Sequence, residues 1–221
     1  MPLLEVCAGS VESALNANAA KADRIELCAE LSVGGLTPSK GMIQLVKEMV
    51  EIPVYVLIKP RSGDFNYSLL ELEQMKEDVA LCAELGCEGV VIGALTPERK
   101  INERITYELM QQAGFMDVTF HKAFDEVVNQ FEALDTLREL GIQRVLTSGG
   151  EATAMAGFSR LGELIEEAED DIIIMPGGGV RSSNIGYLLD LGATEYHSAA
   201  LVEGARHSDK VEIEKMLTGL R

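Results

Sequence analysis

The chain has 221 residues, of which 47% are hydrophobic, and a formal net charge of -17 at pH 7. This length accommodates one large α/β domain or two small ones, and no apolar run approaches the ~20 residues that a membrane-spanning helix needs. The acidic balance argues against nucleic acid and anionic membranes as partners, because both require a basic surface. We therefore expect a soluble globular protein that binds a small molecule or an ion.

The cysteines and the N-terminus indicate where the protein resides. Four cysteines stand at irregular spacing without a CxxC pair, which is typical of reduced thiols rather than of a disulfide framework. The first residues enter strand-like sequence directly and lack the basic segment of a signal peptide. Both features predict a cytoplasmic protein.

Short apolar segments alternate with longer amphipathic ones along the chain, and no linker or change in composition divides it. Several helices have a start signal: Thr37 and Pro38 offer an N-cap followed by a first-turn proline, and residues 68–71 and 129–132 have the spacing of capping boxes. Glycines close several helical runs where a left-handed C-cap would lie. The predicted strands are residues 3–8, 23–29, 53–61, 89–94, 117–123, 144–149, 171–178 and 194–200.

Eight strands, each followed by a helical pattern, predict one (β/α)8 TIM barrel over residues 1–221 with eight parallel strands. An open doubly wound sheet is the alternative, but it usually has fewer strands and a phosphate-binding loop after the first one. Here the glycine-rich loops come late, at residues 148–150 and 176–180. Barrels often build anion sites after their seventh and eighth strands, which favours the barrel.

Alternation of side chains along each strand then predicts which residues face the lumen. Helices cover the outside of a barrel, so the apolar residues Leu4, Val6, Ile25 and Leu27 should point outward. Lys122 should also point outward, one residue after a histidine that ends the fifth strand. The residues that we expect to face the lumen are Glu5, Cys7, Arg24, Glu26, Cys28, Tyr55, Leu57, Lys59, Arg61, Thr119, His121, Glu195 and His197.

A purely structural interpretation competes with a functional one. Buried polar groups can satisfy one another, and the three lumen glutamates could pair with Arg24 and Lys59. Cys82 and Cys87 fit small buried side chains of a helix and its end, and the PGGGV segment could be only a tight turn. Most barrel lumens are packed with valine, isoleucine and leucine, so a set of polar residues on one face favours a site.

Eight collinear motifs between residue 3 and about residue 201 resemble the CutC family, named for copper homeostasis. They are LEVC, ADRIELC, GGLTPS, PRSGDF, TFHKAFD, RVLTSG, MPGGGV and GATEYHSAA. The resemblance implies a (β/α)8 barrel, a cytoplasmic location and copper binding, and the cysteines implicated in Cu(I) binding correspond to Cys7 and Cys28. The family usually has arginine where this chain has Lys59 and Lys122.

Two functional hypotheses follow. The first is a copper homeostasis protein, in which Cys7 and Cys28 bind Cu(I) at the barrel mouth with His197 as a third donor. Cu(I) is a soft ion that prefers thiolates, and two sulfurs suffice for a site of low coordination number. A homodimer is the expected assembly only because barrels often associate.

The second hypothesis is an enzyme that acts on a small anionic or phosphorylated metabolite. His121 and His197 would be the general acid and base, oriented by Glu26 or Glu195. Arg61 and Lys59 would hold the charge of the substrate. A phosphate or another oxyanion would bind at the late loops and at a helix predicted to begin near Ser182. The residues predicted for this anion are Lys59, Ser148, Gly177, Gly178, Gly179 and Ser198.

Overall fold

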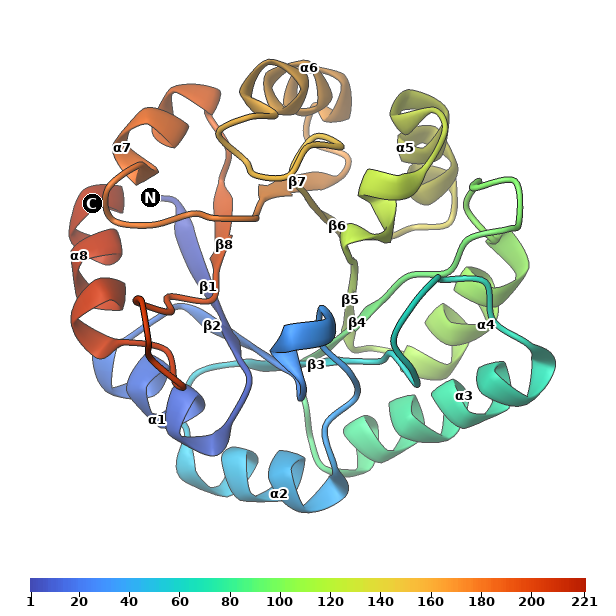
Figure 1. The fold of residues 1–221 in the computed structure, drawn as a ribbon. Coiled ribbons are helices and arrows are strands. Elements are labelled where there is room, and N and C mark those ends of the chain that lie inside the picture. Colours follow the sequence, from blue (N-terminus) through green and yellow to red (C-terminus); the bar gives the residue numbers. More distant parts are fainter.

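Eight strands form a ring at the centre of the molecule, and helices surround it (Figure 1). The structure is a computed structural model that describes residues 1–221. The strands are β1 (Leu3–Ala8), β2 (Arg24–Leu27), β3 (Val54–Leu57), β4 (Gly89–Ile92), β5 (Asp117–Phe120), β6 (Arg144–Thr147), β7 (Ile173–Pro176) and β8 (Glu195–Ser198).

Eight α-helices form the outer layer, and none of them combines the length and apolar content needed to cross a membrane. They are α1 (Val11–Ala20), α2 (Lys40–Met49), α3 (Leu69–Glu84), α4 (Glu103–Ala113), α5 (Gln130–Glu139), α6 (Phe158–Ala168), α7 (Ile185–Leu188) and α8 (Lys210–Leu220). Three 3-10 helices lie in the connections: η1 (Leu31–Val33), η2 (Lys122–Glu126) and η3 (Leu189–Leu191).

All hydrogen-bonded strand pairs are parallel, which confirms the predicted (β/α)8 barrel. The ladder runs in the order β7-β6-β5-β4-β3-β2-β1-β8. β7 and β8 are neighbours without a ladder between them, so this seam is the one break in the ring. At the mouth the seam is bridged by side chains, because the Ser198 hydroxyl donates to the Val180 carbonyl at 2.6 Å and Arg181 donates to Ser198 at 3.0 Å.

The helix starts agree only in part with the prediction. Ser68 caps α3 in a full capping box, as predicted. Asn129 caps α5, but its cap consists only of bonds from backbone N–H groups to its own side chain. The predicted cap at Thr37 is wrong: Ser39 caps α2, and the Thr37 hydroxyl instead accepts a hydrogen bond from the Lys59 N–H at 2.8 Å. Thr37 therefore fastens the end of β3 rather than a helix.

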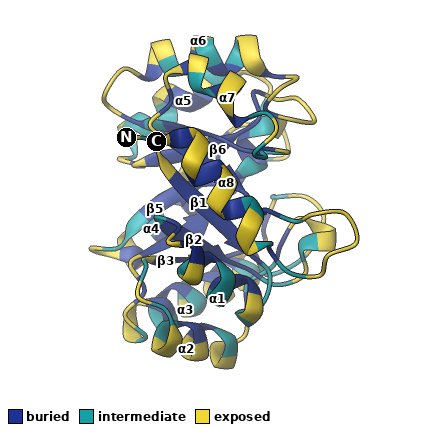
Figure 2. Cartoon of the chain, turned by 90° about the vertical axis from the view of Figure 1, so that its left-hand side faces the viewer, coloured by how far each residue is buried: buried dark blue, intermediate teal, exposed yellow.

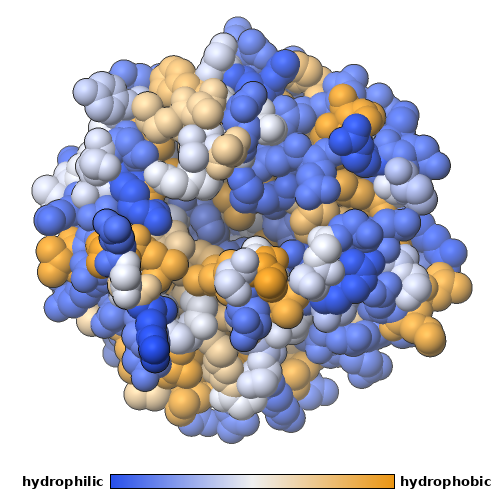
Figure 3. All heavy atoms as spheres, in the orientation of Figure 1, coloured by the Kyte–Doolittle hydropathy of each residue, from blue (hydrophilic) through white to orange (hydrophobic).

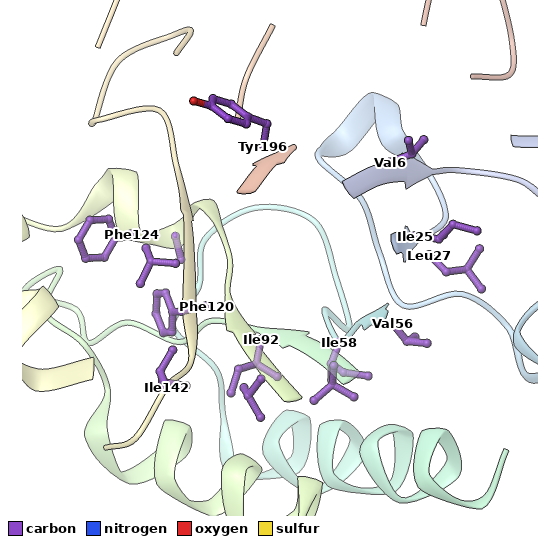
Figure 4. Packing of buried hydrophobic residues seen from close by; sticks show 14 of the residues in the cluster. Val6, Ile25, Leu27, Val56, Ile58, Ile92, Phe120, Phe124, Ile142 and Tyr196 are labelled. Atoms are coloured by element: carbon purple, nitrogen blue, oxygen red, sulfur yellow. The ribbon is translucent and has the colours of Figure 1, made fainter. Parts of the chain in front are cut away.

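The main core lies between the strands and the helices (Figure 2). Leu4, Val6, Ile25 and Leu27 belong to it, as the alternation predicted. Figure 4 shows Val6, Ile25 and Leu27 among these core side chains. A separate small cluster fills the lumen, and it consists of Cys7, Cys28, Tyr55, Leu57 and Val91. The predicted assignment of faces is confirmed for these strands, and it places the thiols inside the barrel.

Candidate functional site

A cavity of about 230 Å³ opens at the carboxyl ends of the strands, the face seen in Figure 3. Cys7, Glu26 and Cys28 line its wall on β1 and β2, and His197 lines it on β8. The η1 turn lies over this side of the mouth (Figure 1). The opposite wall is formed by the segments that follow β5 and β7. This end of the barrel is where (β/α)8 proteins place their functional residues.

The two predicted thiols meet in this cavity. The Sγ atoms of Cys7 and Cys28 are 3.6 Å apart, and both side chains are buried. The hydrogen bond with Cys28, burial and the neighbouring Glu26 together raise the pKa of Cys7 well above the ordinary thiol value. Cys7 also belongs to a second group, because its sulfur, a Glu26 oxygen and a His197 nitrogen lie within 4.8 Å of one another. Cys7 is therefore the residue that links the thiol pair to the imidazole.

Glutamates hold His197 from two sides. Its Nδ1 lies 2.7 Å from Glu5 Oε1, and its Nε2 lies 3.7 Å from Glu26 Oε2. Burial alone would lower the pKa of His197, but the carboxylates of Glu26 and Glu5 outweigh burial and raise it. Burial raises the pKa of Glu26. Glu5, rather than Glu26 or Glu195, is thus the residue that orients the ring of His197.

Beneath the cavity lies a network of buried charges. Arg24 Nε donates to Glu5 at 2.6 Å, and Arg24 also pairs with Glu195. Arg144 donates from Nε to the same Glu195 at 2.7 Å. The structural interpretation of Glu5 and Glu195 is therefore confirmed for their pairing with Arg24, whereas Lys59 takes no part. Glu195 does not line the cavity, so its predicted role beside a catalytic histidine has no support in its position.

His121 ends β5 and lines the cavity, as predicted. Its Nδ1 accepts a hydrogen bond from the Ala123 N–H at 3.1 Å, so the proton of the neutral ring is on Nε2. Nε2 is buried and has no partner. Burial and the nearby Lys59 lower the pKa of His121 to about 3. His121 is therefore a neutral residue of the cavity lining whose Nε2–H is buried without a partner, and it is not a reservoir for a second proton.

Gly89 in β4 and Gly93 directly after it make room for the rings of Tyr55 and His121. A Cβ on Gly93 would lie 2.3 Å from His121 Cε1 and 2.4 Å from its Nδ1. A Cβ on Gly89 would similarly lie 2.7 Å from the ring of Tyr55. The ring of Phe65 lies 4.9 Å from that of His121 and covers it from the loop after β3. The GVVIGA segment is thus the sequence signal for the space that His121 occupies.

Two of the basic residues are placed differently from the prediction. Arg61, predicted to face the lumen, lies outside the cavity and pairs with Asp64 at 2.9 Å and Glu71 at 2.5 Å. Lys122, predicted to point outward, lines the cavity, with its Nζ 2.6 Å from Ser148 Oγ and 2.9 Å from Asp125. Alternation fails in both cases because β3 and β5 have already ended at these residues.

The predicted anion-binding residues divide into two groups. Lys59, Gly178, Gly179 and Ser198 line the cavity. Ser148 is fully buried, and its hydroxyl already bonds to the Lys122 ammonium and to the Asp125 carboxylate. The Ser148 N–H donates to the same carboxylate. The N–H of Gly177 donates to Thr147. These two residues are therefore parts of the scaffold of the loop.

The helix predicted near Ser182 begins only at Ile185 and is four residues long. The N–H of Ser182 donates to Glu212 at 2.7 Å, so it is not free to bind an anion. Sequence reasoning also missed Arg181, which lines the cavity directly after the glycine-rich segment. Its position after PGGGV, in the loop already proposed for an anion, is the signal that could have found it.

The fold and these side chains define a class: a (β/α)8 barrel with a thiol and imidazole site at its mouth. The family model of the CutC family matches residues 2–202. The copper homeostasis protein cutC homolog of Homo sapiens is 49% identical over 199 residues, which cover 90% of this chain and 73% of that protein. A family protein CutC of Salmonella schwarzengrund is 48% identical over 200 residues, 90% of this chain and 80% of that protein.

Solved structures agree with this assignment. A crystal structure of a CutC from Streptococcus agalactiae has a TM-score of 0.85 and 34% identity, and it covers 90% of this chain and 99% of that one. A thiamine phosphate pyrophosphorylase of Pyrococcus furiosus has a TM-score of 0.68 and 13% identity over 99% of this chain and 95% of that one, a likeness of fold alone. The chain belongs to the CutC family.

Proposed function

We propose that this protein serves copper homeostasis by binding Cu(I) at Cys7 and Cys28. The observation that supports this most strongly is the distance of 3.6 Å between their sulfurs inside a cavity at the barrel mouth. The named relatives of the family are copper homeostasis proteins, and a soft monovalent ion prefers such thiolates.

The distance between the two sulfurs is nearer to that of a three-coordinate site than to that of a two-coordinate site. With metal–sulfur bonds of ~2.3 Å, a linear site needs sulfurs ~4.6 Å apart and a trigonal site needs them about 4.0 Å apart. The present 3.6 Å is nearer the trigonal value. A ring nitrogen of His197 lies within 4.8 Å of the Cys7 sulfur, and Glu5 fixes this ring from the other side, but Cys28 does not belong to that group, so its sulfur must move toward the ring for His197 to be a third donor. Glu26 is a hard oxygen donor and suits Cu(I) less well.

A competition titration of Cu(I) against a chelator tests the site. The double variant Cys7→Ser with Cys28→Ser should lose affinity by more than the ~100-fold that removal of an outer-shell partner costs. The matched control is Cys82→Ser with Cys87→Ser, a second pair of buried thiols outside the cavity. Equal copper affinity in the parent and the first double variant would contradict the proposal.

A second candidate function is an enzyme that acts on a small anionic metabolite. It is favoured by His121, whose Nε2 is buried in the cavity wall without a partner. An unsatisfied buried donor carries a cost of about 1–3 kcal/mol, which a ligand acceptor would remove. A neutral N–H donor suits the polarisation of a carbonyl or the stabilisation of a developing oxyanion. The sequence predicted His121 as a general acid or base. In this candidate function it is instead a neutral hydrogen-bond donor that polarises the substrate.

The test of this candidate is a search for turnover in a mixture of metabolites. The purified protein is incubated with a cell extract freed of macromolecules, and mass spectrometry follows which anionic compounds change. The parent should convert at least one compound that His121→Phe leaves unchanged, because phenylalanine fills the space without an N–H donor. Identical profiles for the parent and His121→Phe would rule out the enzyme.

A further inference from the structure

The cavity gathers positive charge in a protein that has 36 acidic and 19 basic residues. Lys59 and Arg181 both line it, and neither has a carboxylate within 4.0 Å. Every other basic residue without such a partner is exposed: Lys21, Lys40, Arg99, Arg206, Lys215 and Arg221. In so acidic a chain, one buried and one half-buried cation without acidic partners indicate a ligand that supplies the negative charge.

Lys59 is the stronger case. The residue is only 5% exposed, and its Nζ donates one long hydrogen bond, to the Val33 carbonyl at 3.5 Å. The ring of Phe65 lies 5.1 Å from the same nitrogen and keeps water from one side. A buried ammonium with one weak hydrogen bond leaves two of its three donors unused. These donors belong to the cavity wall, beside the unpartnered Nε2 of His121.

The segment after β7 supplies a second group of unused donors. The N–H groups of Gly178 and Gly179 donate no hydrogen bond, and both residues line the cavity. Both have positive φ, 91° and 72°, which only glycine adopts readily and which turns successive amides to one side. The guanidinium of Arg181 uses only Nη1, for the Val180 carbonyl and Ser198. Within the predicted anion-binding loop, the free donors are therefore the backbone amides of Gly178 and Gly179, and the Arg181 side chain directly after the PGGGV segment adds a third group.

The two groups of donors face each other across the barrel. Lys59 follows β3 and Gly178 follows β7, and these strands are four positions apart in the ring of eight. Lys122 Nζ lies 3.3 Å from the point that a Cβ on Gly178 would occupy, so it adds charge on the β7 side. A carboxylate has only two oxygens and cannot accept from all of the donors that follow β7. A phosphate has three terminal oxygens and fits them better.

We infer that the cavity binds a small organic phosphate that carries a second negative group. The phosphate lies against Gly178, Gly179 and Arg181, and the second group lies against Lys59, on the side of the cavity that His121 also lines. This inference names a substrate class for the second candidate function. The bound phosphate is a substrate only if that enzymatic function holds. Binding itself requires neither copper nor turnover.

Calorimetric titration of the full-length protein, without copper, tests the inference with two probes. Inorganic phosphate tests the β7 side alone, and 2-phosphoglycolate carries a phosphate and a carboxylate. We expect both to bind saturably with one site per chain, and phosphoglycolate to bind more tightly. Arg181→Gln should weaken both probes by roughly tenfold to a hundredfold, because it removes charged hydrogen bonds. Lys59→Met should abolish the advantage of phosphoglycolate over phosphate.

The matched control is Lys215→Met, which removes one exposed positive charge without an acidic partner. It should bind both probes like the parent. Lys59→Arg, which keeps the charge, should retain the preference for phosphoglycolate. In the parent, added phosphate should also shift the amide NMR signals of Gly178 and Gly179, a result that needs no variant to fold.

Absence of saturable phosphate binding in the parent would overturn the inference. So would equal affinities for the two probes, or variants of Arg181 and Lys59 that bind like Lys215→Met. The Cys7→Ser and Cys28→Ser double variant should bind phosphoglycolate like the parent. Loss of copper binding and loss of phosphate binding are thereby separate results, and turnover is measured independently of both.

Discussion

Arg24 holds the charged floor of the barrel together, and its replacement by methionine should cost the fold several kcal/mol. The residue is 5% exposed and joins the buried carboxylates of Glu5 and Glu195. Arg24→Met keeps most of the volume of the stem but leaves Glu5 without its closest cation. Removing one partner of a buried ion pair typically costs about 3–5 kcal/mol.

The pKa of Glu5 gives a second estimate, which combines the effects of Arg24, His197 and burial on this carboxylate. Burial raises it, but Arg24 and His197 lower it from 4.5 to about 2. A shift of this size corresponds to about 3 kcal/mol of stabilisation of the charged form. Because the folded pKa is depressed, this contribution is complete above the unfolded value near 4.5 and is lost as the pH falls toward 2. The two estimates therefore agree.

Urea unfolding at pH 7 measures the loss, and Lys100→Met is the control. Lys100 pairs with Glu132 at 2.7 Å, but both side chains are 56% exposed, so its replacement should leave the stability nearly unchanged. The difference between the parent and Arg24→Met should narrow at pH 3, where an unpaired Glu5 is protonated. A loss below ~1 kcal/mol at pH 7, or a difference that does not change with pH, would refute this reasoning.

Two further outcomes follow from the site. The pKa of Cys7 is raised by its hydrogen bond with Cys28 and by burial, so Cu(I) must displace its proton. Copper affinity should therefore rise at least about tenfold per pH unit between pH 6 and 8, and a flat profile in a chelator titration would contradict this. Gly93→Ala should push the His121 ring aside and cost about 1–3 kcal/mol in urea unfolding, whereas Gly41→Ala, where no atom lies within 4 Å, should be neutral or stabilising.

The barrel could be predicted because its signals are local and repeated. Each strand is a short apolar segment followed by a helical pattern, and alternation assigns Val6 to the helices and Cys7 to the lumen. The thiol pair could be predicted for the same reason, since Cys7 and Cys28 lie inward on adjacent strands. Their actual separation depends on the stagger of β1 against β2, which pairs Cys7 with Glu26 rather than with Cys28. Alternation alone does not contain that register.

The residues beyond the strand ends could not be predicted in this way. Arg61 follows Pro60, where β3 has ended, and the carboxylates of Asp64 and Glu71 capture it on the outside. Lys122 begins the 3-10 helix η2, whose turn carries it into the cavity. The conformation of a loop depends on which of several possible partners its side chains contact, and sequence spacing does not show which contact forms.

One wall of the cavity carries the two thiols, and the other walls carry cationic side chains. This arrangement couples the binding of a metal ion at the thiols to the binding of an anion at the cations. Two thiolates around one Cu(I) ion carry a net charge of -1, on the wall formed by β1 and β2. Lys59, Lys122 and Arg181 on the remaining walls attract that complex and also attract a phosphate. Within a cavity of about 230 Å³, the two anions share the same cations and repel each other. Since coupling between two binding sites is reciprocal, each must weaken the other by the same factor. The proposed copper site and the proposed anion site are thus separate sets of donors in one cavity, where each affects the electrostatic potential at the other.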